Sequence, residues 1–180
     1  CVADDIDQAW EAIKVANKSR IHVFTSTSDI HMEHMLRKTK EEVLEDARES
    51  VKYAKKLCED VEFSAQDATR TDKDFLIEIL KVAVEEGATT INVPDTVGYA
   101  TPSDYLELLK GVYDDVKGKN EDIIISTHCH NDLGLAVANS LTAITAGARQ
   151  IEGAINGIGE RAGNTSTEEI IMAVKTRQDQ

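Results

Sequence analysis

Two histidines separated by a single residue, His128 and His130, form the pair in this sequence whose type and spacing could do chemistry. They follow the run 122–127, whose apolar residues predict a buried strand. Side chains alternate between the two faces of a strand, so both imidazoles point the same way and Cys129 points the other way. Neighbouring imidazoles at the carboxyl end of such a strand are typical of metal and substrate sites in α/β proteins.

The types of ligand narrow the choice of metal. Two neutral imidazoles together with oxygen ligands suit Zn²⁺, Mn²⁺, iron or cobalt, and an open octahedral site of this kind tolerates Mg²⁺. Two histidines leave the site incomplete, so a carboxylate has to come from elsewhere in the fold. Asp132 lies too close to the histidines in sequence to be assigned to the same ion.

Polar segments also follow the other predicted strands. A single polar loop is usually a solvated connection, and a hydroxyl or carboxylate after a strand is often only a helix cap. Several polar segments together favour a functional site, because the carboxyl ends of parallel strands meet at one end of a barrel. The histidines would then meet Thr96, Asn164 and the adjacent Glu160 and Arg161. The four segments are 25–29, 64–70, 94–98 and 156–164.

The elements that must position these residues alternate along the chain. Five short β-rich runs are each followed by an amphipathic segment, a pattern that predicts βα units, a parallel sheet and one domain. The predicted strands are 20–25, 61–64, 89–93, 122–127 and 150–155. The predicted helices are 3–18, 39–58, 72–86, 101–118, 132–146 and 165–175.

Several helix ends and one ion pair can be predicted locally. Thr39 and Glu42 have the spacing of a capping box, and Thr101 precedes a proline at the first helical position. Thr71 and Thr165 are further expected caps. Asp67 and Arg70 are close enough in sequence to pair with each other.

Composition excludes some classes of function. The formal charge of −13 argues against nucleic acid as a partner, because phosphate binding needs a basic patch. No apolar run approaches the length of a membrane helix, so we expect no membrane association. Three scattered cysteines fit a reducing cytoplasm, and the first residues resemble neither a signal peptide nor a normal start. We therefore expect a cytoplasmic protein of which these residues are an excerpt.

Four motifs together carry a resemblance to a known family. Segments 27–32, 91–99, 127–134 and 156–164 have the order and spacing of motifs in the 2-isopropylmalate synthase family, which are metal-dependent Claisen-condensing (β/α)8-barrel enzymes. The resemblance covers essentially the whole chain. It implies an α/β fold that is a partial (β/α)8 TIM barrel, roughly strands four to eight with their helices. Residues 1–180 would be the C-terminal portion of the catalytic barrel, without its N-terminal strands and the C-terminal regulatory region.

The resemblance also implies an activity and a set of residues. Members are acyltransferases that condense acetyl-CoA with 2-oxoisovalerate to 2-isopropylmalate, the first committed step of leucine biosynthesis, and a homodimer is expected. A divalent metal, Mg²⁺ or Mn²⁺ or alternatively Zn²⁺, would polarise the keto acid. By position the metal residues are His128, His130 and Asn164; the substrate-binding residues are His22, Ser64, Thr96 and Asn164; and the catalytic residues are Gln66 and Glu160.

Two departures from the family pattern keep alternatives open. Gln66 stands where the family has a glutamate, and an amide keeps the shape but loses the charge and the ability to accept a proton. The family's Asp-x-x-Leu-Arg-Asp-Gly motif, which supplies a metal-binding aspartate and an arginine, is absent from the sequence. The alternatives are a sibling synthase for citramalate, homocitrate or methylthioalkylmalate, and a non-catalytic metal-binding or pseudoenzyme form. We expect these 180 residues alone to be inactive.

Overall fold

The computed structural model describes residues 2–118, 120 and 122–177. Five parallel strands form one sheet in the order β1-β2-β3-β4-β5. This confirms the predicted βα alternation and the parallel sheet. The strands are β1 (Arg20–Ser26), β2 (Asp60–Gln66), β3 (Thr90–Asp95), β4 (Ile124–Cys129) and β5 (Gln150–Glu152).

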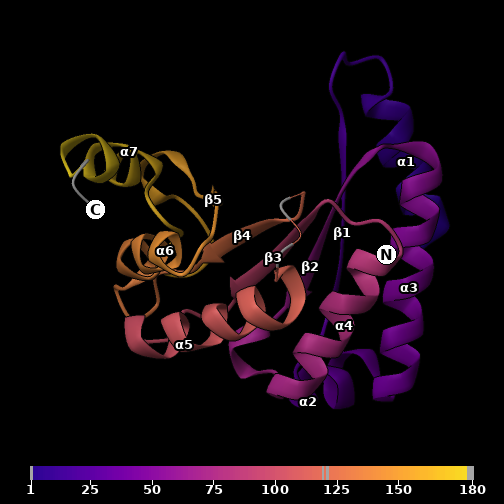
Figure 1. The fold of residues 1–180 in the computed structure, drawn as a ribbon, viewed down its shortest axis with the longest axis horizontal. Coiled ribbons are helices and arrows are strands. Elements are labelled where there is room, and N and C mark those ends of the chain that lie inside the picture. The colour runs from indigo at the N-terminus through magenta and orange to yellow at the C-terminus, as the bar shows by residue number, and fades with distance from the viewer. Residues whose placement is uncertain (1, 119, 121, 178–180) are drawn as a thin grey trace.

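Helices cover one side of this curved sheet (Figure 1). Helix α3 contacts β1 and β2 at one end, α4 contacts β2 and β3 beside it, and α6 contacts β4 toward the other end. Helix α7 packs against α6 near the C-terminus. The longer helices are α1 (Ala3–Ile13), α3 (Lys40–Leu57), α4 (Lys73–Glu85), α5 (Pro102–Val112), α6 (Ala136–Thr145) and α7 (Thr167–Thr176).

The core lies between the sheet and these helices. Val43 of α3, Phe63 of β2, Leu80 of α4 and Ile91 of β3 are all inaccessible to solvent. Alternation along each strand sends one set of side chains into this core and the other set to the opposite face. Tyr105 of α5 is also fully buried, and its hydroxyl donates to the Val93 carbonyl. The helix-covered face is therefore structural, and the opposite face remains for a site.

Two predicted helix caps are confirmed and two are wrong. Thr39 and Thr101 both accept the expected backbone hydrogen bonds in capping boxes. The residue that caps α4 is Asp72, because the Thr71 hydroxyl is bonded instead to Thr27 and to the Asp67 carbonyl. The residue before α7 is Ser166, because the Thr165 hydroxyl is bonded to Ser140 of α6. In both cases a hydroxyl joins two segments instead of capping its own helix.

Some boundaries also differ from the prediction. Strand β5 ends at Glu152, and the chain then forms a 3₁₀ turn, Ile155–Gly157. Helix α6 begins only at Ala136, because the Asn131 side chain accepts a hydrogen bond from the Ala136 amide and holds a turn before it. Sequence reasoning also missed α2 (Asp29–His31) and the π-helical turn Met32–Leu36. No helix among the described residues is both long and apolar enough to cross a membrane.

Candidate functional site

A cavity of about 350 Å³ lies on the face of the sheet that the helices leave uncovered. All of the predicted site residues except Asn164 line it. They come from β1, β2 and β4 and from the loops that follow β3, β4 and β5, so the expected convergence at the carboxyl ends is confirmed. The lining residues are His22, Phe24, Ser64, Gln66, Asn92, Pro94, Thr96, His128, His130, Glu152 and Glu160.

His128 of β4 and His130, which follows this strand, lie side by side in the cavity. Their ring centroids are 5.2 Å apart, with the planes inclined by 36°. The Cys129 side chain is fully buried and contacts the Thr127 hydroxyl at 3.4 Å. His128 Nδ1 is 3.0 Å from Glu152 Oε2, and this bond raises the pKa of His128. Burial and the neighbouring His128 lower the pKa of His130, so its imidazole is held in the neutral form that binds metals.

Asn164 lies next to this pair although it does not line the cavity. Its backbone pairs with that of His130 in an isolated antiparallel bridge. The side-chain oxygen of Asn164 and the Nδ1 of His130 are both buried and have no hydrogen-bond partner among the described residues. Buried polar atoms are rarely left unpaired, so such atoms point to a missing ligand.

These residues fit a divalent cation as part of its ligand set. Two imidazoles and an amide oxygen are donors of the kinds that such ions accept. Within the described part of the chain, no group of three or more histidine, cysteine, aspartate or glutamate side chains could hold a metal. The donors present are therefore a partial set.

A second hydrogen-bonded group lies on β1, β2 and β3. His22 Nε2 is 2.6 Å from Ser64 Oγ, and the Asn92 amide donates to the same oxygen at 2.9 Å. Burial lowers the pKa of His22, which favours its neutral form. Sequence reasoning missed Asn92, although it lies on β3 and shares a face with Thr96. The alternation of faces, extended backward from Thr96, would have found it.

Arg161 joins the loop after β5 to the loops that follow β3 and β4. This side chain donates to both carboxylate oxygens of Asp132, at 2.7 and 3.0 Å, and to the Thr96 carbonyl at 2.8 Å. The guanidinium lowers the pKa of Asp132. Glu160, which is mostly exposed, is thereby placed at the cavity rim. Gly98 is needed here, because a Cβ on it would lie 2.7 Å from the Asp132 amide nitrogen.

The remaining predicted residues are held by neighbouring loops. The Gln66 side-chain oxygen accepts a hydrogen bond from Ser26 at the end of β1. The Thr96 hydroxyl accepts from the Asp67 amide at 2.8 Å, which leaves its own O–H available to donate to a ligand. Asp67 is fully buried and binds Arg70 with both oxygens, as expected from the sequence.

Two carboxylates of the inner face were missed by sequence reasoning. Glu62 is only 4% exposed, and burial together with a hydrogen bond to Glu152 raises its pKa to about 7. Burial opposes ionisation of Glu152 as well, but hydrogen bonds from His128 and from Glu62 outweigh it and lower the pKa of Glu152. When this pair carries one proton, the two shifts place it on Glu62. The alternation of strand faces could have found both residues. Glu62 lies two positions before the predicted site residue Ser64, and Glu152 lies two positions after the polar residue Gln150 of the same strand.

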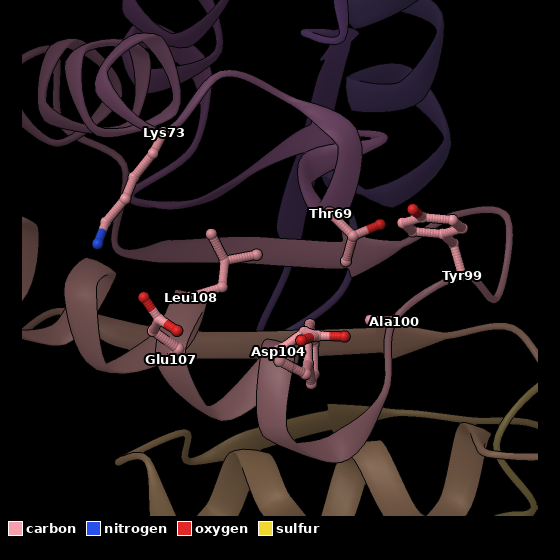
Figure 2. A pocket seen from close by; sticks show the side chains of 8 residues that line it. Thr69, Lys73, Tyr99, Ala100, Asp104, Glu107 and Leu108 are labelled. Carbon is pink, nitrogen blue, oxygen red and sulfur yellow. The ribbon is translucent and has the colours of Figure 1, made fainter.

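Another cavity, of about 400 Å³, lies on the helical side of the molecule. It is lined mainly by α4, α5 and the loops before them, and it contains none of the predicted site residues. Figure 2 shows Lys73 and Glu107 at one end of it and Thr69 and Tyr99 at the other. The predicted site residues therefore gather at the inner cavity and not at this one.

The fold and the site together define a class of protein. Parallel strands with helices outside, and a polar cavity at their carboxyl ends, are the architecture of part of a (β/α) barrel, a fold whose enzymes have their active sites at that end. The chain belongs to the HMGL-like family, whose family model matches residues 1–180.

Curated relatives in the same family are called 2-isopropylmalate synthase. The chain is 58% identical over 176 residues to the protein of that name from Clostridium kluyveri, covering 98% of this chain and 34% of the relative. It is 55% identical over 178 residues to the one from Pyrococcus furiosus, covering 99% and 36%. The chain thus spans about a third of the length of these relatives.

Solved structures of lower identity show the same fold. A hydroxymethylglutaryl-CoA lyase from Pseudomonas aeruginosa matches with a TM-score of 0.78 at 16% identity, over 94% of this chain and 59% of that one. The carboxyl transferase domain of Rhizobium etli pyruvate carboxylase matches with a TM-score of 0.69 at 17% identity, over 97% and 28%. The five strands therefore correspond to part of an HMGL-like TIM barrel.

Proposed function

We propose that this chain is part of the catalytic barrel of an acyltransferase that condenses acetyl-CoA with 2-oxoisovalerate to give 2-isopropylmalate. The observation that carries the proposal is the convergence of His22, Ser64, Thr96, His128 and His130 on one cavity. The relatives called 2-isopropylmalate synthase, at 55–58% identity, support it. The reaction would be the first committed step of leucine biosynthesis, in the cytoplasm.

The five strands would be strands four to eight of the complete barrel. In that arrangement residues 1–180 form its C-terminal portion, and the first three strands and a C-terminal regulatory region belong to other parts of the protein. The partial ligand set supports this assignment, because His128, His130 and Asn164 need a carboxylate that the described residues do not supply.

The roles of the residues follow from their chemistry. His128, His130 and Asn164 would hold Mg²⁺, Mn²⁺ or Zn²⁺, and the bound ion would supply Lewis acidity toward the carbonyl of the keto acid. Thr96 would donate its free O–H to the keto-acid carboxylate. Ser64, which shares hydrogen bonds with His22 and Asn92, would orient the substrate beside it.

Gln66 and Glu160 are the proposed catalytic residues, with different capacities. Gln66 can orient a group by hydrogen bonding but cannot take a proton. Glu160 is a carboxylate at the rim, where acetyl-CoA would enter. A sibling synthase that uses another keto acid remains the second candidate, because the bulk of one methylene changes binding by only about 1–3 kcal/mol. The assembly proposed for the full protein is a homodimer.

Free CoA release by the full-length enzyme that contains this chain tests the proposal. The assay uses acetyl-CoA, Mg²⁺ or Mn²⁺, and a panel of 2-keto acids, with the wild type compared with Gln66→Glu. We expect release with 2-oxoisovalerate and a higher kcat in Gln66→Glu. Preference for another keto acid would support a sibling synthase, and no release by either version with any keto acid would support a non-catalytic protein.

A further inference from the structure

We propose that Glu152 is a positioning residue that selects the tautomer and the ring orientation of His128 for metal binding. The inference rests on the proposed function in one respect, which is that His128 is a metal ligand. Residues 128 and 152 face each other in the register of β4 and β5, and Glu152 Oε2 lies 3.0 Å from His128 Nδ1.

The chemistry of this contact determines the tautomer. A carboxylate accepts hydrogen bonds, so the proton of the neutral imidazole resides on Nδ1 and the lone pair resides on Nε2. A histidine that binds a metal through one nitrogen commonly donates its other N–H to a carboxylate, and this contact orients the ring. Glu152 thus prepares Nε2 of His128 to accept a cation.

Glu152 is itself held in place from the side away from the histidine. Its other oxygen, Oε1, accepts from the Ser126 hydroxyl at 2.9 Å and from the Gln150 amide at 3.3 Å. The two oxygens therefore have different tasks, one toward the imidazole and one toward the strand neighbours. Because both oxygens are engaged, rotation of the carboxylate would break bonds at each.

The contacts continue to the far end of the inner face. Gln150 also donates to Glu62 at 3.1 Å and accepts from Arg20 at 2.6 Å, and Arg20 donates to Glu62 at 3.0 Å. These residues come from β1, β2 and β5, so three strands support one carboxylate. Glu62 is buried and the other members are partly exposed, so the group costs stability unless its polar atoms are paired, and apolar side chains would fill the same space at lower cost. A requirement to orient His128 accounts for their presence.

Mn²⁺ binding to the full-length enzyme, followed by electron paramagnetic resonance, tests this role. We expect Glu152→Ala to bind Mn²⁺ about 10–100-fold more weakly than the wild type. Glu152→Met, which fills the space without an acceptor, should lose affinity equally. Glu152→Gln should retain most of the affinity, because its amide oxygen can still accept from Nδ1. Asp60→Asn is the matched control, because it removes a carboxylate that bonds Arg20 but does not touch His128.

Nitrogen-15 NMR of the metal-free enzyme provides a second readout that does not depend on activity. The wild type should show the Nδ1–H tautomer of His128, and Glu152→Met should show a mixture. Equal Mn²⁺ affinity and an unchanged tautomer in Glu152→Met would overturn the positioning role. A different outcome is that the wild type binds no Mn²⁺ but the tautomer of His128 still differs between the wild type and Glu152→Met. This result would overturn the proposed metal site and leave the contact between Glu152 and His128 intact.

Discussion

At the scale of single residues, the inner face of the sheet differs chemically from the helix-covered face. Residues two apart along each strand share a face, and on the inner face they are polar in β2 and β4: Glu62, Ser64 and Gln66, then Ser126 and His128. The outer face of the same strands carries Val61, Phe63 and Ile125, all buried against helices. One strand therefore serves the core and the site at the same time.

The buried Glu62 predicts a pH dependence of stability. Its pKa is about 7 in the folded protein, against 4.5 as its ordinary value. Between these values the unfolded chain has released this proton and the folded protein has not, so the unfolding free energy falls as pH rises through the window. Glu62→Gln, which carries no titrating proton, should lose less stability between about pH 5 and pH 8. Each pKa unit between the folded and the unfolded value of Glu62 corresponds to about 1.4 kcal/mol of unfolding free energy.

Thermal unfolding of the full-length protein and of its Glu62→Gln variant at both pH values measures the effect. The lowered pKa of Glu152 has the opposite effect on the unfolding free energy. That effect falls at pH values below the ordinary pKa of Glu152, outside this window. Parallel changes in the two proteins between pH 5 and pH 8 would contradict the assignment of the shared proton to Glu62.

At the scale of elements, the tip of the loop after β5 is held by the Arg161 side chain, and its far end is held by backbone pairing of Gly163 and Asn164 with residues 130 and 131. Arg161 joins the tip to Asp132 and to the Thr96 carbonyl, and none of residues 156–162 is buried. The position of Glu160 at the cavity rim therefore depends on the guanidinium.

We expect Arg161→Ala to raise the KM for substrate several-fold and to expose residues 156–164 to proteolysis. The exposed pair contributes little to global stability, so the melting temperature should change little. Arg161→Lys should be intermediate, because a lysine keeps the charge but cannot bind both Asp132 oxygens in a fork. Steady-state kinetics and limited proteolysis check this. Unchanged cleavage of the loop in Arg161→Ala would show that other contacts hold it.

The N-terminus of α3 offers a local test of stability. Thr39 accepts a hydrogen bond from the Glu42 amide, and the Glu42 carboxylate accepts one from the Thr39 amide at 2.8 Å. Thr39→Ala should lower the unfolding free energy by about 1 kcal/mol, as measured by denaturant unfolding. Ser166→Ala is the comparison, because Ser166 precedes α7 without a side-chain capping bond and should cost less. A larger loss of unfolding free energy in Ser166→Ala than in Thr39→Ala would contradict this prediction.

At the scale of the whole molecule, the described sheet has two outer strands, β1 and β5, each paired on one side only. Helix α7 also exposes Ile171, Met172 and Val174, each at least half accessible. Unpaired strand edges and exposed apolar side chains both favour association with other chains. In a closed barrel of eight strands the same edges would be paired.

We therefore expect the 180 residues, expressed alone, to self-associate and to release no CoA. Size-exclusion chromatography with light scattering measures the association, and the thiol assay measures the activity. Adding the preceding barrel strands in one polypeptide should reduce the association. A stable monomer of the 180 residues would contradict the importance of the two edges.

Much of the architecture was determined by the sequence alone, because it depends on interactions between residues close in the chain. Alternating βα patterns predicted the five strands and the parallel sheet, and the spacing of His128 and His130 placed both rings on one face. The Thr39 and Thr101 caps were likewise predictable, because each bonds a residue three positions away. The convergence of polar loops followed from parallel strands having their carboxyl ends together.

Only the tertiary structure decided which distant residues meet. The pairing of His128 with Glu152 depends on the register between β4 and β5, and Asn92 meets Ser64 through the register of β2 and β3. Thr71 and Thr165 were misassigned as caps because partners on other segments bind their hydroxyls. The physical reason is the same in each case: a hydrogen bond between segments distant in the chain depends on how the whole fold is assembled, which no local pattern encodes.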